Sequence, residues 1–289
     1  MRAILPKFVT RIFLLAVLTL LGGLLSATLV RFAPGYGIDE RELDPRLSQA
    51  SVEALRSSRR INSGIVAYYG RYLSNLIRGD FGTSQWLGRP VRALVQERLP
   101  VTARSVLIGM LLAWVAALAC VLATYFPGGV LLSFPGTTAS GVFIALPTGV
   151  VAMFAVYLRA PAFVAIAVVL FPKLFRYVRN LLADAYSQPH VLATRARGVT
   201  QTRLVFRHVL PMAAPALLAL FGVSLSMAFG AAIPIEALCD SPGLGQLAWQ
   251  AALNRDLPLI MNITLLITLL TVIVNSLAGL VAAPHQRPA

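Results

Sequence analysis

Long uncharged stretches alternate with short charged ones along the chain, and their lengths decide how they can fold. The first uncharged run covers residues 12–30 and has an arginine at each end. A longer run, 105–158, is interrupted by Pro127-Gly128-Gly129, which predicts a hairpin of two helices, 105–126 and 130–158. An α-helix rises about 1.5 Å per residue, so roughly 20 apolar residues cross the hydrocarbon core of a bilayer. The pattern therefore predicts membrane-spanning helices.

Three more runs bring the expected number of spans to six: 160–178, where Lys173 can snorkel to the interface, 212–235 and 257–283. Proline and glycine inside these runs are compatible with membrane helices, because neighbouring helices can satisfy the freed backbone groups. The spans leave a long loop at 31–104 and a second loop at 179–211. We expect an all-α membrane protein with one transmembrane domain over residues 1–289.

Composition agrees with this interpretation, and the basic residues orient it. The chain is 57% hydrophobic and 12% charged, with a mean hydropathy of +0.76. The segment between spans four and five contains many basic residues and a single acid, Asp184, which predicts that it lies in the cytoplasm. Both termini are then expected on the same side, and residues 31–104 outside. Membrane ends and lipid headgroups account for the net charge of +14, so membrane lipid is an expected partner and nucleic acid is not.

The outer loop contains one amphipathic segment. Apolar side chains recur at helical spacing at Ile65, Tyr69, Tyr72, Leu73 and Leu76, and Arg71, Ser74, Asn75 and Arg78 occupy the other side. The segment predicts a helix that lies either in the membrane interface or over the outer surface of the protein.

Catalytic and metal-binding patterns were sought without success. His190, His208 and His285 do not stand at metal-ligand spacing with a second ligand, and no phosphate-binding glycine loop or nucleophile elbow occurs. Glu236 and Asp240 lie at or beyond the end of a span, which disfavours a buried proton relay. Cys120 and Cys239 are predicted at opposite membrane faces, too far apart for a disulfide. We expect a non-enzymatic conduit without its own metal or cofactor.

The basic loop before span five has the features of a docking element. Residues 193–197 predict a short helix that ends at Gly198, because glycine adopts the left-handed conformation at low cost. Thr200 can cap a second helix, 201–209, and Leu210-Pro211 is expected to stop it before span five. The small side chains of Ala193 and Ala196 would allow another protein to approach closely.

The spacing A-x(4)-G-x(11)-L-P at Ala193, Gly198, Leu210 and Pro211 resembles the EAA loop of ABC importer permeases. The longer pattern "RYVRN…ATRARGV…RHVLP" resembles the dipeptide, oligopeptide and nickel importer branch of that family. Four further motifs occur in the family's order: VRFAPG (30–35), RGDFGTSQWLGRPVRALVQERLPVT (78–102), PGLGQL (242–247) and NRDLPLI (254–260). The resemblance covers most of the chain.

The resemblance implies a type I ABC importer permease fold, with a cytoplasmic coupling helix and a long extracytoplasmic loop after the first span. It implies a bacterial or archaeal cytoplasmic membrane, a second homologous permease, two ATPase subunits that bind ATP and Mg²⁺, and an extracytoplasmic binding protein. ATP-driven closure of the ATPases would switch the spans between outward-open and inward-open arrangements. The residues implied in ATPase docking are Ala193, Thr194, Arg195, Ala196, Arg197, Gly198 and Arg203. Relatives transport peptides, nickel chelates, glutathione or antimicrobial peptides.

One outer segment has two interpretations. Pro242, Gly243, Leu244 and Gly245 form either an outer gate element that starts a helix at 246–253 and meets the binding protein, or a tight turn. The chain also departs from the family pattern, with Leu192 in place of the leading glutamate, Tyr36 after APG, Pro211 in the loop, and a short YLRAP connection. Two other functions remain open: a membrane scaffold or sensor subunit that recruits a partner through the basic loop, and a passive channel.

Overall fold

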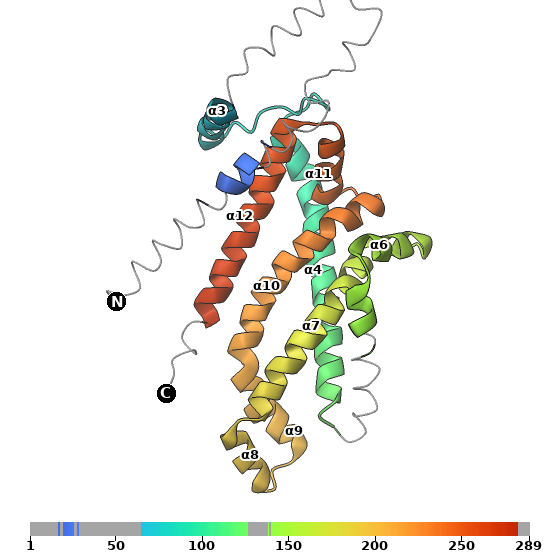
Figure 1. Ribbon diagram of the computed structural model, residues 1–289, viewed down its shortest axis with the longest axis vertical. Coiled ribbons are helices and arrows are strands. Elements are labelled where there is room, and N and C mark those ends of the chain that lie inside the picture. Colours follow the sequence, from blue (N-terminus) through green and yellow to red (C-terminus); the bar gives the residue numbers. More distant parts are fainter. Residues whose placement is uncertain are drawn as a thin grey trace, which may run out of the picture. The chain divides into compact units, whose positions relative to one another are not determined.

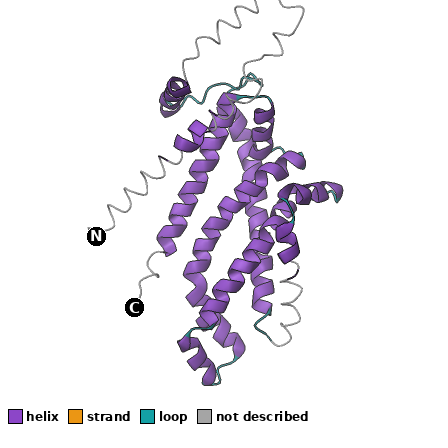
Figure 2. Cartoon of the chain, viewed as in Figure 1, coloured by secondary structure: helices purple, strands orange, loops and turns teal. Residues whose placement is uncertain are grey.

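The computed structural model describes residues 65–126 and 140–282, together with residues 17, 20–25, 28 and 138. Regular structure in these residues is helical (Figure 2). The chain divides into two compact units, which are described separately: Met1–Glu97 with Gln250–Leu269, and Arg98–Trp249 with Leu270–Ala289.

The named helices follow one another along the chain as α3 (Ile65–Ile77), α4 (Val91–Ala123), α6 (Thr148–Tyr157), α7 (Ala162–Tyr186), α8 (Pro189–Ala196), α9 (Gln201–Leu204), the π-helix η2 (Val205–Val209), α10 (Leu210–Leu238), α11 (Leu244–Leu253) and α12 (Leu257–Ala282). Residues 20–25 and 140–145 are also helical.

Three of the described helices are long and apolar enough to cross a membrane: Val91–Ala123, the continuous helix Gln201–Leu238, and Leu257–Ser276 within α12. They overlap the expected spans two, five and six, and that these helices cross a membrane stays a prediction. Helix α4 begins at Val91, earlier than the expected residue 105, and has 33 residues. A helix of that length rises about 50 Å, so its charged first turns can continue outside a hydrocarbon core of about 30 Å.

The expected third and fourth spans differ from the structure. The helix over residues 140–145 ends before Pro147, and α6 starts after it with only 10 residues. The expected single helix over 130–158 is therefore interrupted within the described residues, because Pro147 has a ψ of 141°, outside the helical region. Helix α7 runs past residue 178 to Tyr186 and carries charged residues in its second half. The first span lies mostly outside the described residues, as does the loop at 31–64, and the count of six spans stays a prediction.

The core of the second unit forms where α7 and α10 pack side by side, with α6 against both (Figure 1). Helix α7 contributes large fully buried side chains, including Leu170, Leu174 and Phe175, and α10 contributes small ones such as Ala228 and Ala232. Gly109 lets α4 approach α7 closely, since a Cβ there would lie 2.7 Å from the carbonyl oxygen of Phe163.

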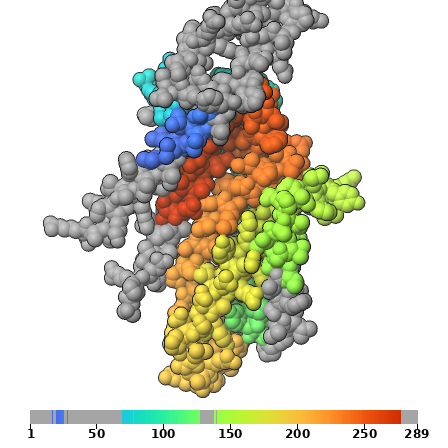
Figure 3. All heavy atoms as spheres, viewed as in Figure 1, coloured from blue at the N-terminus to red at the C-terminus, as the bar shows by residue number. Residues whose placement is uncertain are grey.

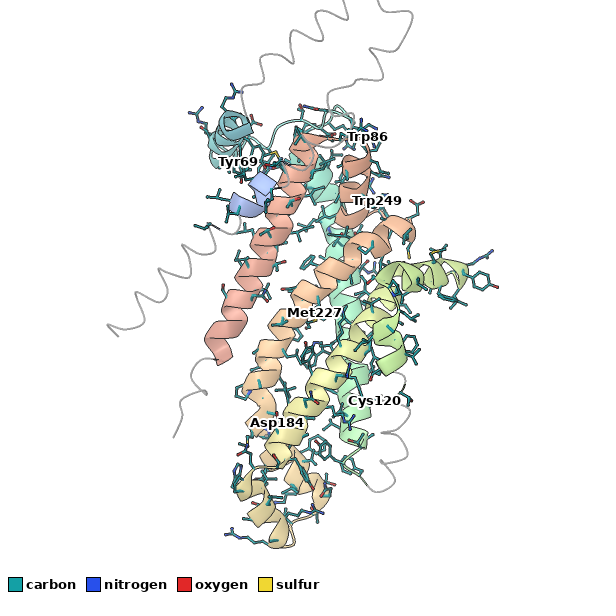
Figure 4. The ribbon with its side chains drawn as sticks, viewed as in Figure 1. Tyr69, Trp86, Cys120, Asp184, Met227 and Trp249 are labelled. Carbon is teal, nitrogen blue, oxygen red and sulfur yellow. The ribbon has the colours of Figure 1, made fainter. Side chains whose placement is uncertain are left out.

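The first unit contains α3, which forms the amphipathic helix that the sequence predicts. Tyr69 is buried in a cluster with Leu257 and Met261, and its hydroxyl donates a 2.7 Å hydrogen bond to the carbonyl oxygen of Leu20 (Figure 4). Arg71, Ser74 and Asn75 are exposed on the other side. Of the two expected placements, the contacts favour packing on the protein itself.

Candidate functional site

Helices α8 and α9 form an exposed end of the second unit, beyond α7 and α10 (Figure 3). Helix α8 ends at Ala196, and Gly198 has a φ of +77°, which confirms the predicted helix and its glycine end. The N–H of Gly198 donates a 3.0 Å hydrogen bond to the carbonyl oxygen of Arg195. Only glycine adopts this left-handed conformation without a steric cost. Thr200 occupies the N-cap of α9, but its side chain makes no capping hydrogen bond there.

Tyr186, the last residue of α7, holds this end of the unit together. Its hydroxyl accepts a 3.2 Å hydrogen bond from the amide nitrogen of Gln201. Its ring lies 5.2 Å from the ring of Tyr125, centroid to centroid, and the Arg195 guanidinium carbon lies 6.0 Å from its centroid. Tyr186 therefore connects the end of α7 to both α8 and α9. The sequence pattern did not indicate this role.

The loop at residues 187–209, called here the docking loop after its predicted role, presents a mixed surface of small, basic and apolar side chains. The predicted docking residues are exposed, except for the partly buried Thr194: Ala193, Arg195, Ala196, Arg197, Gly198 and Arg203. Two large apolar side chains join them, since Leu192 is 48% exposed and Phe206 is 51% exposed. Val191, also on α8, is fully buried, so it fixes this helix against the rest of the second unit. Apolar side chains surrounded by arginines are typical of a protein interface.

The loop runs directly into α10 without a stop, so the expected break at Leu210-Pro211 is wrong. Residues 205–209 form a π-helix, in which the N–H of Leu210 donates to the carbonyl oxygen of Val205. A proline inside an α-helix clashes with the carbonyl group four residues earlier and removes one hydrogen bond. The wider π-turn directly before Pro211 relieves this conflict and keeps one continuous helix from Gln201 to Leu238.

At the opposite end of α10, the carboxylate of Glu236 joins three helices of the second unit. Its Oε2 accepts a 2.8 Å hydrogen bond from the N–H of Gly245 and a 3.0 Å hydrogen bond from the hydroxyl of Thr102. The same hydroxyl oxygen accepts a 2.7 Å hydrogen bond from the N–H of Leu244. Glu236 is fully buried and Thr102 is 2% exposed. The carboxylate thereby satisfies the first turn of α11, where free N–H groups and the helix dipole favour negative charge.

The glycines of the PGLG segment are needed for close packing at this junction. A Cβ at Gly245 would lie 2.7 Å from the Cα of Ile233, and a Cβ at Gly243 would collide with the carboxylate of Glu236. Neither glycine is among the described residues with positive φ. Helix α11 begins at Leu244, two residues before the expected start. Gly243 and Gly245 therefore let α11 sit against α10, instead of supplying a left-handed turn.

A second buried carboxylate organises the first unit. The Oδ2 of Asp256 accepts hydrogen bonds from the hydroxyl of Ser84 and, at 3.1 Å, from the N–H of Trp86. Its Oδ1 accepts a 3.2 Å hydrogen bond from the N–H of Leu259 in the first turn of α12. The amide nitrogen of Asn262 donates a 2.9 Å hydrogen bond to the carbonyl oxygen of Phe81. The RGDFG and NRDLP segments, distant in sequence, are thus joined in space.

Comparison with known proteins gives these contacts a family context. Residues 131–286 match the sequence model of the family described as binding-protein-dependent transport system inner membrane component. The chain is 29% identical over 307 residues to the oligopeptide transport system permease protein AppB of Bacillus subtilis, covering 96% of each protein. It is 26% identical over 306 residues to the probable peptide ABC transporter permease protein y4tP of Sinorhizobium fredii, covering 96% of the chain and 95% of the relative.

A solved structure shares the fold. A chain of the MetNI methionine ABC transporter, in an inward-facing conformation, superposes with a TM-score of 0.60 at 19% sequence identity. The match covers 68% of the present chain and 98% of the other. At this level of identity the similarity shows a shared fold and nothing further.

Proposed function

The chain belongs to the family of binding-protein-dependent transport system inner membrane components, and from this we propose that it is the permease subunit of an ATP-driven importer of peptides. The full-length similarity to permeases named for oligopeptide and peptide transport supports the substrate class. In this proposal the whole chain is one permease domain with six spans in a bacterial or archaeal cytoplasmic membrane, and both termini are cytoplasmic.

One observation carries the proposed mechanism. Helix α8 is joined by a short turn at residues 197–200 to a helix of 38 residues, Gln201–Leu238, which includes the π-helix. The far end of this helix is bonded through Glu236 to α11. Because the helix is unbroken from Gln201 onward, it can transmit a displacement of the loop to its far end. We infer that α8, with Ala193, Arg195, Ala196 and Gly198 at its exposed surface, docks on an ATPase subunit, assisted by Thr194, Arg197 and Arg203.

The remaining parts of the proposed transporter follow from this role. A second permease completes the path, two ATPase subunits bind ATP and Mg²⁺, and an extracytoplasmic protein delivers the peptide. The segment Pro242–Gly245, held against α10 by Glu236, acts as an outer gate element that moves when the helix moves. A bistable arrangement of this kind is the physical requirement for coupling ATP hydrolysis to transport.

The proposal is tested by purifying the chain from its native membrane and measuring peptide uptake in proteoliposomes. We expect two ATPase subunits and a second permease to co-purify, and uptake to require ATP and the binding protein. A stable assembly of this chain alone, or uptake driven by an ion gradient without ATP, would contradict it. A scaffold or sensor subunit would bind partners without any uptake, and a passive channel would conduct without ATPases.

A further inference from the structure

Two polar side chains of the second unit form a hydrogen bond between α10 and α12, which are otherwise mostly apolar. The hydroxyl of Ser226 on α10 donates a 3.0 Å hydrogen bond to the Oδ1 of Asn275 on α12. Asn275 is exposed and Ser226 is partly exposed. In the part of the chain that the structure describes, no acceptor is bonded to the amide nitrogen of Asn275. Its two N–H donors are therefore available to a group beyond the described residues.

Lipid is an unfavourable neighbour for this pair. Moving an amide group into hydrocarbon without a hydrogen-bond partner costs several kcal/mol. Polar side chains within membrane-spanning segments accordingly face a water-filled cavity, a solute path or another helix. Among the described residues, the other exposed side chains of the same helices are apolar, and Phe221 on α10 is 45% exposed while Ile273 on α12 is 42% exposed. These apolar positions suit lipid, and the Ser226–Asn275 pair does not.

Gly230 extends the polar surface along α10. It lies one helical turn after Ser226, on the same side of the helix. It is exposed, and a Cβ at this position would have no atom within 4 Å. The absence of a side chain leaves the helix backbone open to a passing molecule, and packing inside this chain does not require the glycine.

We propose that Ser226, Gly230 and Asn275 line the path of the transported solute, and that the Asn275 amide donates hydrogen bonds to its carbonyl or carboxylate oxygens. This inference rests on the proposed function and assigns the solute contact to particular residues. The Ser226 hydroxyl donates to Oδ1 of Asn275, so the pair still offers both amide N–H donors to the solute. Donors match the backbone carbonyl groups of a peptide, which every peptide carries whatever its side chains. They do not match a cation.

The test uses the complete transporter in membranes, with Cys120 and Cys239 replaced by alanine. Both are free cysteines, and Cys120 lies on α4 (Figure 4). Single cysteines are then placed at Ser226→Cys, Asn275→Cys and Gly230→Cys. Phe221→Cys and Ile273→Cys are matched controls, because they lie at exposed apolar positions on the same two helices, and helical spacing places them away from the polar side chains. Labelling by a charged, membrane-impermeant thiol reagent is followed with and without ATP and with a peptide mixture from a casein digest.

We expect cysteines at 226, 230 and 275 to react faster than those at 221 and 273, and the peptide mixture to slow the reaction at 275. If none of the three reacts while ATP-driven peptide uptake persists, the pair packs against a partner helix and the path assignment is overturned. Equal reaction at all five positions, or labelling at 275 that peptides do not slow, would also overturn it. Absence of ATP-dependent peptide uptake by the unsubstituted transporter, with all of its subunits assembled, would instead contradict the proposed function.

Transport kinetics give a second measurement that does not need a cysteine. Asn275→Asp keeps the acceptor for Ser226 and removes both N–H donors, and Asn275→Gln keeps the donors. Loss of one hydrogen bond worth about 1 kcal/mol corresponds to a rise of about fivefold in the KM for peptide. We expect this rise for Asn275→Asp and a smaller one for Asn275→Gln. An unchanged KM in Asn275→Asp would overturn the donor role.

Discussion

The N–H of Gly245 donates a 2.8 Å hydrogen bond to the carboxylate of Glu236, nine residues earlier in the chain. The last turn of α10 thereby holds the first turn of α11 through a side chain that is fully buried. Thr102 bonds to the same carboxylate oxygen from α4, 134 residues away in sequence. A single carboxylate therefore fixes where α11 begins and how closely it packs.

Replacing Glu236 separates its hydrogen-bond role from simple packing. Glu236→Leu leaves the buried N–H of Gly245 without an acceptor, and each such loss costs about 1–3 kcal/mol. Glu236→Gln retains a carbonyl oxygen that can accept from Gly245 and Thr102. We expect a lower unfolding temperature in detergent for Glu236→Leu and a value near that of the parent for Glu236→Gln. Equal unfolding temperatures for the parent and both variants would show that these bonds contribute little.

Gly245→Ala tests the close packing of α11 on α10. The added methyl group would lie 2.7 Å from the Cα of Ile233, and forcing a methyl group into a packed interface typically costs about 1–3 kcal/mol. Gly141→Ala is the matched control, because Gly141 is helical and nothing lies within 4 Å of a Cβ there. Thermal unfolding should be lowered for Gly245→Ala and unchanged or raised for Gly141→Ala. The reverse order would contradict the packing assignment.

Local features of the fold were predictable from the sequence. Helical spacing located α3, long uncharged runs located most of α4, α10 and α12, and one glycine located the end of α8, because each signal depends on neighbouring residues. The buried carboxylates could not be located in this way. Glu236 follows a long apolar run and was expected at the end of a span, and its partner Thr102 is 134 residues away in the sequence. Asp256 depends on Ser84, 172 residues away. The π-helix before Pro211 also escaped prediction, since proline usually ends a helix.

Gly198 should be essential for the shape of the docking loop. Its φ is +77°, and a β-branched residue in this left-handed conformation costs roughly 1–2 kcal/mol, while asparagine tolerates it better. We expect Gly198→Val to lose peptide-stimulated ATPase activity in the assembled transporter and Gly198→Asn to keep most of it. The amount of assembled complex is measured in parallel. Full stimulation in Gly198→Val would remove the docking loop from the coupling mechanism.

Tyr186 should determine how firmly α8 and α9 are held. Tyr186→Phe removes the hydrogen bond from Gln201, and Tyr186→Leu also removes the aromatic contacts with Tyr125 and Arg195. Their losses are expected to be about 1 kcal/mol for the hydrogen bond and about 0.5–1 kcal/mol for the exposed cation–π contact. Trypsin should cleave the arginine-rich loop faster in Tyr186→Phe and fastest in Tyr186→Leu. Tyr177→Phe, at a 50% exposed position of α7, serves as the control and should leave cleavage unchanged.

Asp256 should control the order of the loop at residues 78–90. It accepts hydrogen bonds from Ser84 and Trp86 while capping α12, so Asp256→Ala leaves several buried donors without an acceptor, and the lost helix cap alone costs about 0.5–2 kcal/mol. Proteolysis in this loop should become faster. Asp80→Ala is the matched control, because Asp80 bonds only locally to Gly82 at an exposed position, and its loss should have a much smaller effect. If Asp80→Ala loosens the loop as much as Asp256→Ala does, local turn geometry, and not the bond between the two distant segments, holds it in place.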